Sequence, residues 1–142
     1  MAGTSPFFRL YLNAHISLYR LTGGRVGGRL GPVRILLLTT MGNKSKQPRT
    51  TPVGYFMDGE DYVITGTNGG QPRHPGWYFN LLRDPHATIL VGSNQTEVTA
   101  QQADAEQTKR LWDILVKIAP LYSRYRELPG REVPMMILRQ AR

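Results

Sequence analysis

From residue 34 onward the chain consists mainly of short apolar segments separated by turn residues, a pattern that predicts closely spaced β-strands. Residues 35–38 are entirely apolar and predict a buried strand. Asp58 and Gly59 predict a hairpin turn of the Asp-Gly kind. The predicted strands span residues 34–41, 49–58, 61–66, 87–91, 97–102 and 133–139.

Two helices are predicted within this series of strands. The first spans residues 76–83 and begins after Pro75. The second spans residues 104–118, with Asp104 as N-cap and Gln107 as its capping-box partner. Its expected buried face consists of Leu111, Ile114, Leu115 and Ile118. Antiparallel strands with short hairpins and few helices predict a mainly β (α+β) fold, built on a small closed or half-closed barrel.

Residues 7–21 predict a separate amphipathic helix, because Phe8, Leu12, His15 and Tyr19 recur at helical spacing. Two interpretations of its apolar face remain open: the face docks on the barrel, or it lies in a membrane interface. Residues 21–32 contain five glycines and two arginines and predict a flexible basic linker. The chain is therefore divided into an N-terminal helix and linker (residues 1–32) and a barrel domain (residues 33–142).

A chain of 142 residues can bury roughly two-thirds of its unfolded surface in one domain, so no disulfide or metal is needed for a core. It contains no cysteine, which excludes disulfides and thiol chemistry and suits a reducing cytoplasm. The three histidines are too scattered in sequence to indicate a metal cluster.

The formal net charge is +8, and it is unevenly distributed. Residues 1–57 contain eight Lys and Arg side chains and no acidic one, whereas the basic and acidic side chains of residues 58–142 balance. This asymmetry predicts attraction to an anionic partner such as a cofactor or a lipid headgroup. Nucleic acid is not expected as a partner, because the sequence has no zinc-finger spacing, RNA-binding signature or basic zipper.

A basic loop joins two of the predicted strands. Residues 42–52 read Gly-Asn-Lys-Ser-Lys-Gln-Pro-Arg-Thr-Thr-Pro and include Lys44, Lys46 and Arg49. Two prolines stiffen the segment, and a stiff loop rich in cationic and hydroxyl donors suits a phosphate or carboxylate ligand. The alternative is a solvated basic turn without a ligand.

A second stretch, residues 67–81, reads Thr-Asn-Gly-Gly-Gln-Pro-Arg-His-Pro-Gly-Trp-Tyr-Phe-Asn-Leu. The two ordered motifs are Gly-x-Lys-Ser-x-x-Pro-Arg-Thr-x-Pro and Gly-Gly-x-Pro-x-His-Pro-x-Trp-Tyr-x-Asn-Leu. This pair resembles the deazaflavin-dependent nitroreductase family, the class that includes the F420-dependent quinone reductases. The resemblance covers about residues 33–138, and it implies a split β-barrel similar to FMN-binding barrels with coenzyme F420 as cofactor.

The resemblance also implies which residues bind the cofactor. The basic loop would hold the phosphate and the acidic tail, and the other segments would line the deazaflavin and its ribityl chain. Packing of Trp77 and Tyr78 in the barrel core is the alternative for these two aromatic residues. The implied cofactor-binding residues are Asn43, Lys44, Ser45, Arg49, Thr50, Thr51, Pro52, Val53, Gly54, Gly66, Thr67, Asn68, Gly76, Trp77, Tyr78 and Asn80.

Tyr122 and Tyr125 follow the second predicted helix and stand three residues apart, so on a helical turn they share a face. Phenols can donate a hydrogen bond or a proton to the oxygen of a substrate that is being reduced. The resemblance implies that both border the substrate pocket, and they are therefore the candidate catalytic residues. A tyrosine pair that only covers the barrel mouth is the alternative.

Three positions depart from the family pattern. Asn68 stands where many members have lysine, so one charged contact to the cofactor is expected to be missing. Gly54 stands where the nitroimidazole-activating member has tyrosine, and Ala119 replaces a further tyrosine of the pattern. These differences put nitroimidazole activation in doubt for this chain.

The sequence thus predicts an F420H2-dependent reductase that transfers hydride to a quinone, an α,β-unsaturated carbonyl or a nitroaromatic. Two alternatives remain open: an FMN-dependent oxidoreductase on the same barrel, and a non-enzymatic module that binds an anionic membrane surface. The expected location is cytoplasmic, with peripheral contact at the inner face of the cell membrane also considered. The sequence leaves the oligomeric state open.

Overall fold

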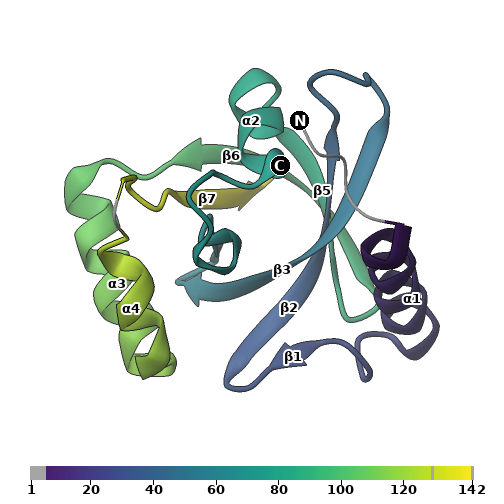
Figure 1. Cartoon of the computed structure of the whole chain (residues 1–142), viewed down its shortest axis with the longest axis horizontal. Helices are drawn as coiled ribbons and strands as arrows, with labels where there is room; N and C mark the ends of the chain where they lie inside the picture. Colours follow the sequence, from purple (N-terminus) through teal and green to yellow (C-terminus); the bar gives the residue numbers. More distant parts are fainter. Residues whose placement is uncertain (1–5, 129, 142) are drawn as a thin grey trace.

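The computed structural model describes residues 6–128 and 130–141 and contains a closed barrel of antiparallel strands (Figure 1). The strands pair in the order β2-β3-β4-β7-β6-β5, and pairing of β5 with β2 closes the barrel. The predicted mainly β fold with flanking helices is confirmed. The barrel strands are β2 (Val33–Met41), β3 (Pro48–Asp58), β4 (Asp61–Thr65), β5 (His86–Val91), β6 (Asn94–Gln102) and β7 (Met135–Gln140).

All six predicted strands are present, and their bounds differ from the prediction by a few residues. β6 begins at Asn94 and not at residue 97. The prediction started too late because Asn94, Gln95 and Thr96 are polar and carry no apolar alternation. A short strand that the sequence did not predict, β1 (Arg29–Leu30), lies within the predicted linker and pairs with the start of β2. Gly31, with φ of +61°, makes the tight turn between them.

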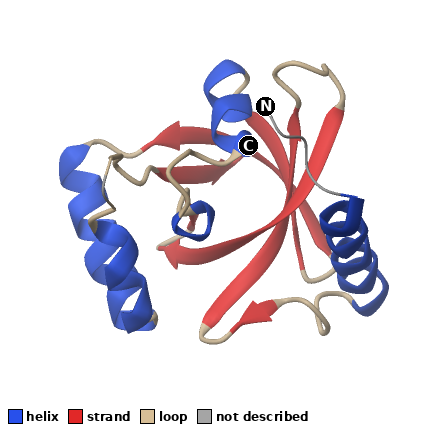
Figure 2. Cartoon of the chain, viewed as in Figure 1, coloured by secondary structure: helices blue, strands red, loops and turns tan. Residues whose placement is uncertain are grey.

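The core consists of two apolar clusters on opposite faces of the same strands. Met136 and Leu138 of β7 point into the barrel, where Leu36, Ile64 and Ile89 also lie. The second cluster lies between the barrel wall and helix α3 (Ala105–Ile118). The alternation of inward and outward residues along β7 explains why its entire apolar run is buried. Figure 2 shows that α3 lies on one side of the barrel and that the N-terminal helix lies on the opposite side.

Helix α3 begins as predicted. The Asp104 carboxylate accepts a hydrogen bond from the N–H of Gln107 at 2.8 Å, and the Gln107 side chain accepts one from the N–H of Asp104 at 3.0 Å. The predicted burial of Ile118 is wrong, because this side chain is 41% exposed. Trp112 is buried instead and centres the packed face on the residues around Leu115, so that Ile118 lies at its edge.

Helix α1 (Pro6–Thr22) docks on the barrel through Tyr19, which is the one fully buried side chain of this helix. The Tyr19 hydroxyl lies 3.0 Å from the carbonyl oxygen of Ile35 and 3.1 Å from that of Leu90. The same oxygen accepts a hydrogen bond from the N–H of Gly92 at 2.9 Å. The expected docking of this helix is therefore confirmed for Tyr19, whereas Phe8 on the same predicted stripe is 51% exposed.

Among the residues that the structure describes, no helix is both long enough and apolar enough to span a membrane. The shorter helical segments include α2 (Gly76–Arg83), a 3-10 turn η2 (Pro120–Tyr122) and α4 (Ser123–Arg126). A further 3-10 turn, η1 (Asn68–Gly70), interrupts the connection between β4 and α2.

Candidate active site

The basic loop is a closed turn at one end of the β2–β3 hairpin. The N–H of Gly42 donates to the carbonyl of Gln47 at 2.8 Å, and the N–H of Lys46 donates to the carbonyl of Gly42 at 2.9 Å. The Ser45 hydroxyl accepts hydrogen bonds from the N–H of Gln47 at 3.2 Å and from Arg49 Nε at 3.3 Å. A Cβ atom at Gly42 would lie 2.2 Å from the Ser45 hydroxyl oxygen and 3.1 Å from the carbonyl oxygen of Gln47, so a larger residue here would displace the Ser45 hydroxyl.

Three cations of this loop face solvent. Lys44, Lys46 and Arg49 are all exposed, and none forms an ion pair with any residue in the described part of the chain. Since residues 1–57 contain no acidic side chain, the positive field of the loop is not neutralised by its sequence neighbours. The loop can therefore hold an anionic ligand, with the Ser45 hydroxyl beside the Arg49 guanidinium.

Asn80 connects helix α2 to the basic loop. Its side-chain oxygen accepts a hydrogen bond from the N–H of Asn43 at 2.9 Å, and its amide group donates to Thr40 Oγ1 at 3.0 Å. Thr40 is the one buried polar side chain among the described residues. Asn80 and Asn43, both predicted as site residues, thus contact each other and fix the loop against the helix.

The segment of β3 that follows the loop has one open edge. Residues 48–54 pair with β2 alone, whereas β4 pairs only with the later part of β3, from Tyr55 to Asp58. Thr50, Thr51, Pro52 and Gly54 are half-buried, and the side chain of Val53 points into the core. At a rise of about 3.3 Å per residue, Arg49 and Gly54 are about 17 Å apart, so this edge suits an elongated ligand.

The second predicted stretch forms a loop in a left-handed backbone conformation. Asn68, Gly69 and Gly70 have φ values of 48°, 64° and 82°. Among the described residues, no acceptor contacts the N–H groups of Asn68 and Gly69. Thr67 is in the right-handed helical region and Asn68 in the left-handed one, a sequence of conformations in which successive N–H groups converge on an anion or a carbonyl oxygen.

Tyr122 and Tyr125 lie beside both of these segments. Their ring centroids are 5.4 Å apart, and the rings meet edge to face. A Cβ atom at Gly54 would lie 3.8 Å from the Tyr122 hydroxyl, and one at Gly70 would lie 3.1 Å from Tyr125 Cε1. A narrow cavity of about 40 Å³ is lined by Gly54, Thr65, Thr67, Tyr122 and neighbouring apolar residues. The structure therefore brings both predicted tyrosines to the open part of β3.

The electrostatic environment keeps Tyr122 protonated. Burial raises the pKa of the Tyr122 phenol above its ordinary value, and the neighbouring Tyr125 raises it further. At neutral pH this hydroxyl is a hydrogen-bond donor at the edge of the cavity.

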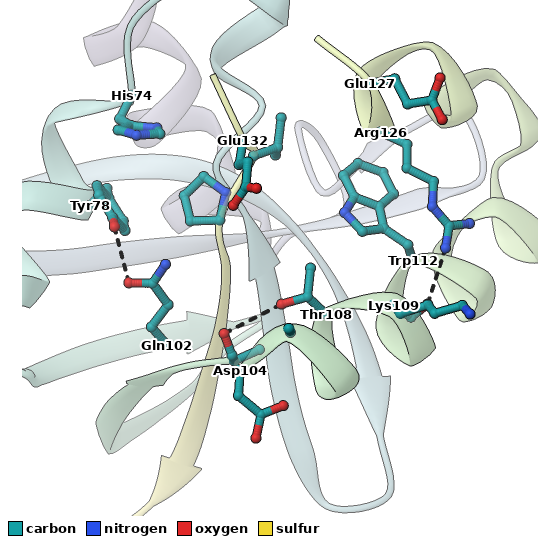
Figure 3. A pocket seen from close by; sticks show the side chains of 14 residues that line it. His74, Tyr78, Gln102, Asp104, Thr108, Lys109, Trp112, Arg126, Glu127 and Glu132 are labelled. Atoms are coloured by element: carbon teal, nitrogen blue, oxygen red, sulfur yellow. Dashed lines mark hydrogen bonds between the residues drawn. The ribbon is translucent and has the colours of Figure 1, made fainter. Parts of the chain in front are cut away.

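The two aromatic residues at the start of α2 have different surroundings. Trp77 is buried in the barrel cluster. The Tyr78 hydroxyl donates to Gln102 Oε1 at 3.0 Å, at the wall of a cavity of about 770 Å³ that also includes His74, Trp112 and Glu132 (Figure 3). Gly76 is exposed at the first turn of α2, where the N-cap Pro75 makes no side-chain hydrogen bond to the helix. Trp77 and Tyr78 thus contribute packing and a polar contact away from the cavity beside Gly54.

Sequence reasoning missed Arg131. Its guanidinium group contacts the carbonyl oxygens of Gly66, Thr67 and Gln71 at 2.9, 2.8 and 3.0 Å, and His74 Nδ1 at 3.0 Å. No local pattern could reveal these contacts, because their partners are more than 55 residues away in the chain. The predicted residues Gly66, Thr67 and Asn68 are therefore held by a residue that lies outside both motifs.

These features fit a ligand with an anionic end and a planar end. Unpaired cations and hydroxyls surround the basic loop, and free N–H donors with phenols surround Gly54 and Gly70. The two glycines let the backbone lie close to Val33, Tyr122 and Tyr125. The donor set thus suits the phosphate and the deazaflavin of coenzyme F420, which the sequence resemblance implied.

Comparison with known proteins gives a consistent assignment. The family model of F420H(2)-dependent quinone reductase matches residues 11–140. The F420H(2)-dependent quinone reductase Rv1261c of Mycobacterium tuberculosis is 41% identical over 131 residues, covering 89% of this chain and 88% of that protein. The solved structure of an F420-H2 dependent reductase (FDR-A) has 30% identity and a TM-score of 0.66, covering 73% of this chain and 92% of that chain.

A second solved structure, described as a domain-swapped dimer, is 27% identical with a TM-score of 0.68 and covers 94% of this chain and 99% of that chain. The family match decides between the cofactors that the sequence left open, because its members are named for F420 and not for a flavin. The chain therefore belongs to the F420H(2)-dependent quinone reductase family and is an F420-dependent oxidoreductase, with reduced coenzyme F420 as its cofactor.

Proposed function

We propose that the chain reduces a quinone, an α,β-unsaturated carbonyl or a nitroaromatic acceptor beside Gly54 and Tyr122. The observation that carries this proposal is the meeting of Gly54 on the open edge of β3, Thr67 and Tyr122 around one narrow cavity, with Tyr125 packed against Tyr122. When bound, reduced coenzyme F420 supplies the hydride. The protein supplies binding, orientation and hydrogen bonding.

The basic loop would hold the anionic part of the cofactor. Lys44 and Arg49 are exposed and free of ion pairs in the described chain, and Ser45 is already oriented by its hydrogen bond with Arg49. Asn80 would act through Asn43, since its hydrogen bond fixes the loop backbone against α2. A ligand along the β3 edge would then reach Gly54 with its other end.

Tyr122 would hydrogen-bond the acceptor oxygen. Its raised pKa keeps the proton on the phenol, and the hydroxyl stands at the edge of the cavity. A donor placed there stabilises the negative charge that develops on the oxygen as the acceptor is reduced. Solvent can complete the protonation, so Tyr122 would accelerate the reaction without being indispensable. Tyr125 would support the Tyr122 ring and the loop at Gly70.

A titration followed by turnover measurements tests this function. We expect the purified protein to bind coenzyme F420 with high affinity and FMN weakly, and to oxidise F420H2 when menadione or an enone is added under anaerobic conditions. A parallel assay with a nitroimidazole tests the departure at Gly54. Binding of F420 without turnover of any of these acceptors would contradict the proposed acceptor classes.

We further propose that this enzyme acts in the cytoplasm, in peripheral contact with anionic membrane. Apolar side chains on α1 remain exposed although the helix is docked, and Arg9 and Arg20 accompany them on a helix without acidic residues. The large exposed residues of α1 are Phe7, Phe8, Leu10, Tyr11, Leu18 and Leu21.

Flotation with vesicles distinguishes this contact from self-association. Binding to phosphatidylglycerol vesicles that decreases with salt, and that Leu10→Ser together with Leu21→Ser abolishes, would support it. A dimer in solution that the same substitutions dissociate, with no vesicle binding, would instead assign this face to a second copy of the chain.

A further inference from the structure

The loop formed by residues 66–71 has a left-handed backbone conformation at its centre. Three successive residues have positive φ, and the first of them, Asn68, is not a glycine. Asparagine and glycine adopt this region readily, but glycine populates many other conformations as well, so contacts with the surroundings are needed to hold the loop in this one. The contacts that hold the loop therefore determine whether its free N–H groups are available to a ligand.

Arg131 makes these contacts from one side. Its three nitrogen atoms reach the carbonyl oxygens of Gly66, Thr67 and Gln71, so they bracket the left-handed residues at both ends. A planar guanidinium can satisfy several acceptors in a fixed geometry, which an ammonium group cannot do. The Arg131 side chain is itself half-buried. The segment that carries Arg131 makes a further contact with the loop, because the N–H of Gly66 donates to the carbonyl of Pro134, three residues after Arg131.

One of these hydrogen bonds acts directly on a free donor. The carbonyl of Thr67 and the N–H of Asn68 belong to the same peptide group. Arg131 donates to that carbonyl at 2.8 Å, whereas the N–H of Asn68 has no acceptor among the described residues. Hydrogen bonds in a chain polarise one another, so a cation on the carbonyl makes the N–H a stronger donor.

We propose that Arg131 is a positioning residue for the reaction: it holds residues 66–71 so that the N–H groups of Asn68 and Gly69 bind the deazaflavin ring. This inference rests on the proposed cofactor site. The effect of Arg131 on the ligand passes through the Thr67–Asn68 peptide group. Because Gly70 packs on Tyr125, displacement of the loop also alters the tyrosine side of the cavity.

The test compares Arg131→Gln and Arg131→Lys with a matched control. Arg110→Gln also removes one positive charge, and the two hydrogen bonds that it removes, at 2.9 Å each, go to Asp58 at the β3–β4 turn and not to residues 66–71. We expect Arg131→Gln to raise the dissociation constant for F420 by at least about tenfold, and Arg131→Lys to lie between this variant and the wild type. Arg110→Gln should bind F420 as the wild type does.

Hydrogen exchange of the cofactor-free proteins gives an independent readout. The amides of Gly70 and Gln71, bonded to the carbonyls of Thr67 and Asn68, should exchange faster in Arg131→Gln than in Arg110→Gln. Faster exchange with unchanged F420 affinity, or unchanged exchange, would overturn the proposal. If the wild type binds no F420, the proposed function fails, and exchange alone then decides whether Arg131 holds the loop. If Arg131→Gln does not fold, Arg131→Lys must show both effects.

Discussion

The backbone of Gly54 faces the hydroxyl group of Tyr122, and a Cβ atom at position 54 would lie 3.8 Å from that oxygen but 2.9 Å from Val33 Cγ1. Val33, which is buried, therefore limits the size of residue 54 more than Tyr122 does. The stiff β-branched side chain of Val33 cannot move away easily.

We expect Gly54→Ala to destabilise the fold by about 1–2 kcal/mol, because the added methyl group overpacks this contact. Val33→Ala combined with Gly54→Ala should relieve the contact, so the double variant should be more stable than the sum of the two single changes indicates. Denaturant unfolding of the four proteins measures this coupling. If the losses of unfolding free energy in the two single variants simply add up in the double variant, Val33 does not limit the size of residue 54.

Tyr122→Phe should lower kcat with quinone acceptors by about ten- to a hundredfold, since a positioned donor typically contributes at least this much. Its affinity for F420 should stay unchanged. Burial and Tyr125 raise the pKa of Tyr122, so its ionisation should not reduce wild-type activity between pH 7 and pH 9. Tyr125→Phe is the control and should have the smaller effect on kcat. Equal kcat for wild type and Tyr122→Phe would assign the protonation to solvent.

Tyr19→Phe should cost about 2 kcal/mol of folding free energy, because the N–H of Gly92 and the part-buried carbonyl of Ile35 lose their hydrogen bonds to the Tyr19 hydroxyl. The measurement is denaturant unfolding, with limited proteolysis in the glycine-rich segment 23–28 as a local readout. Tyr11→Phe, an exposed tyrosine on the same helix, is the matched control. If both variants unfold at the same denaturant concentration as the wild type, the Tyr19 hydroxyl does not anchor α1.

The accuracy of the sequence predictions depends on how local each determinant is. The capping box of α3 needs only Asp104 and Gln107, and it is present as predicted. Burial of Ile118 was wrong because the face of a helix depends on the partner surface, and Trp112 occupies that surface. Strand β1 was missed because two residues between glycines carry no periodic signal.

The same distinction applies to the site. The cationic loop, the glycines and the tyrosine pair are contiguous motifs, so their residue types could be recognised before their arrangement was known. Arg131 could not be recognised, because its role depends on backbone carbonyls of residues that are distant in sequence. Asn80 was predicted as a site residue, but its contacts with Asn43 and Thr40 follow only from the packing of α2 against the hairpin.

His74 should make the folding stability of the protein decrease in mild acid. Arg131 donates to His74 Nδ1, an interaction that requires the neutral ring, and burial together with the charge of Arg131 lowers the pKa of His74 below its ordinary value of 6.5. The unfolded chain thus takes up this proton at higher pH than the folded chain does. Stability should therefore decrease as the pH falls below about 6.5, until the folded-state pKa is passed.

His74→Asn keeps a hydrogen-bond acceptor but does not titrate, so its stability should depend less on pH between 7.5 and 5 than that of the wild type. The difference between the two proteins in how the free energy of unfolding depends on pH isolates the contribution of His74 from those of the other histidines. The rings of Tyr78 and Phe79 face His74, and the charged residues that line the same cavity are Asp104, Lys109, Arg126, Glu127 and Glu132. Parallel pH profiles for the two proteins would exclude His74 as the titrating group.

Arg49→Gln should weaken F420 binding by about tenfold or more, because Arg49 is the cation that the Ser45 hydroxyl holds at the basic loop. Arg20→Gln is the matched control: it removes the same unit of charge from an exposed position on α1, where only the long-range field of the protein changes. Fluorescence titrations at two salt concentrations separate the two contributions. The loss in Arg20→Gln should be small and should vanish at high salt, whereas the loss in Arg49→Gln should persist, since a hydrogen-bonded contact is screened less than a distant charge. Similar losses in both variants at every salt concentration would mean that the net charge attracts the cofactor and that the phosphate lies elsewhere.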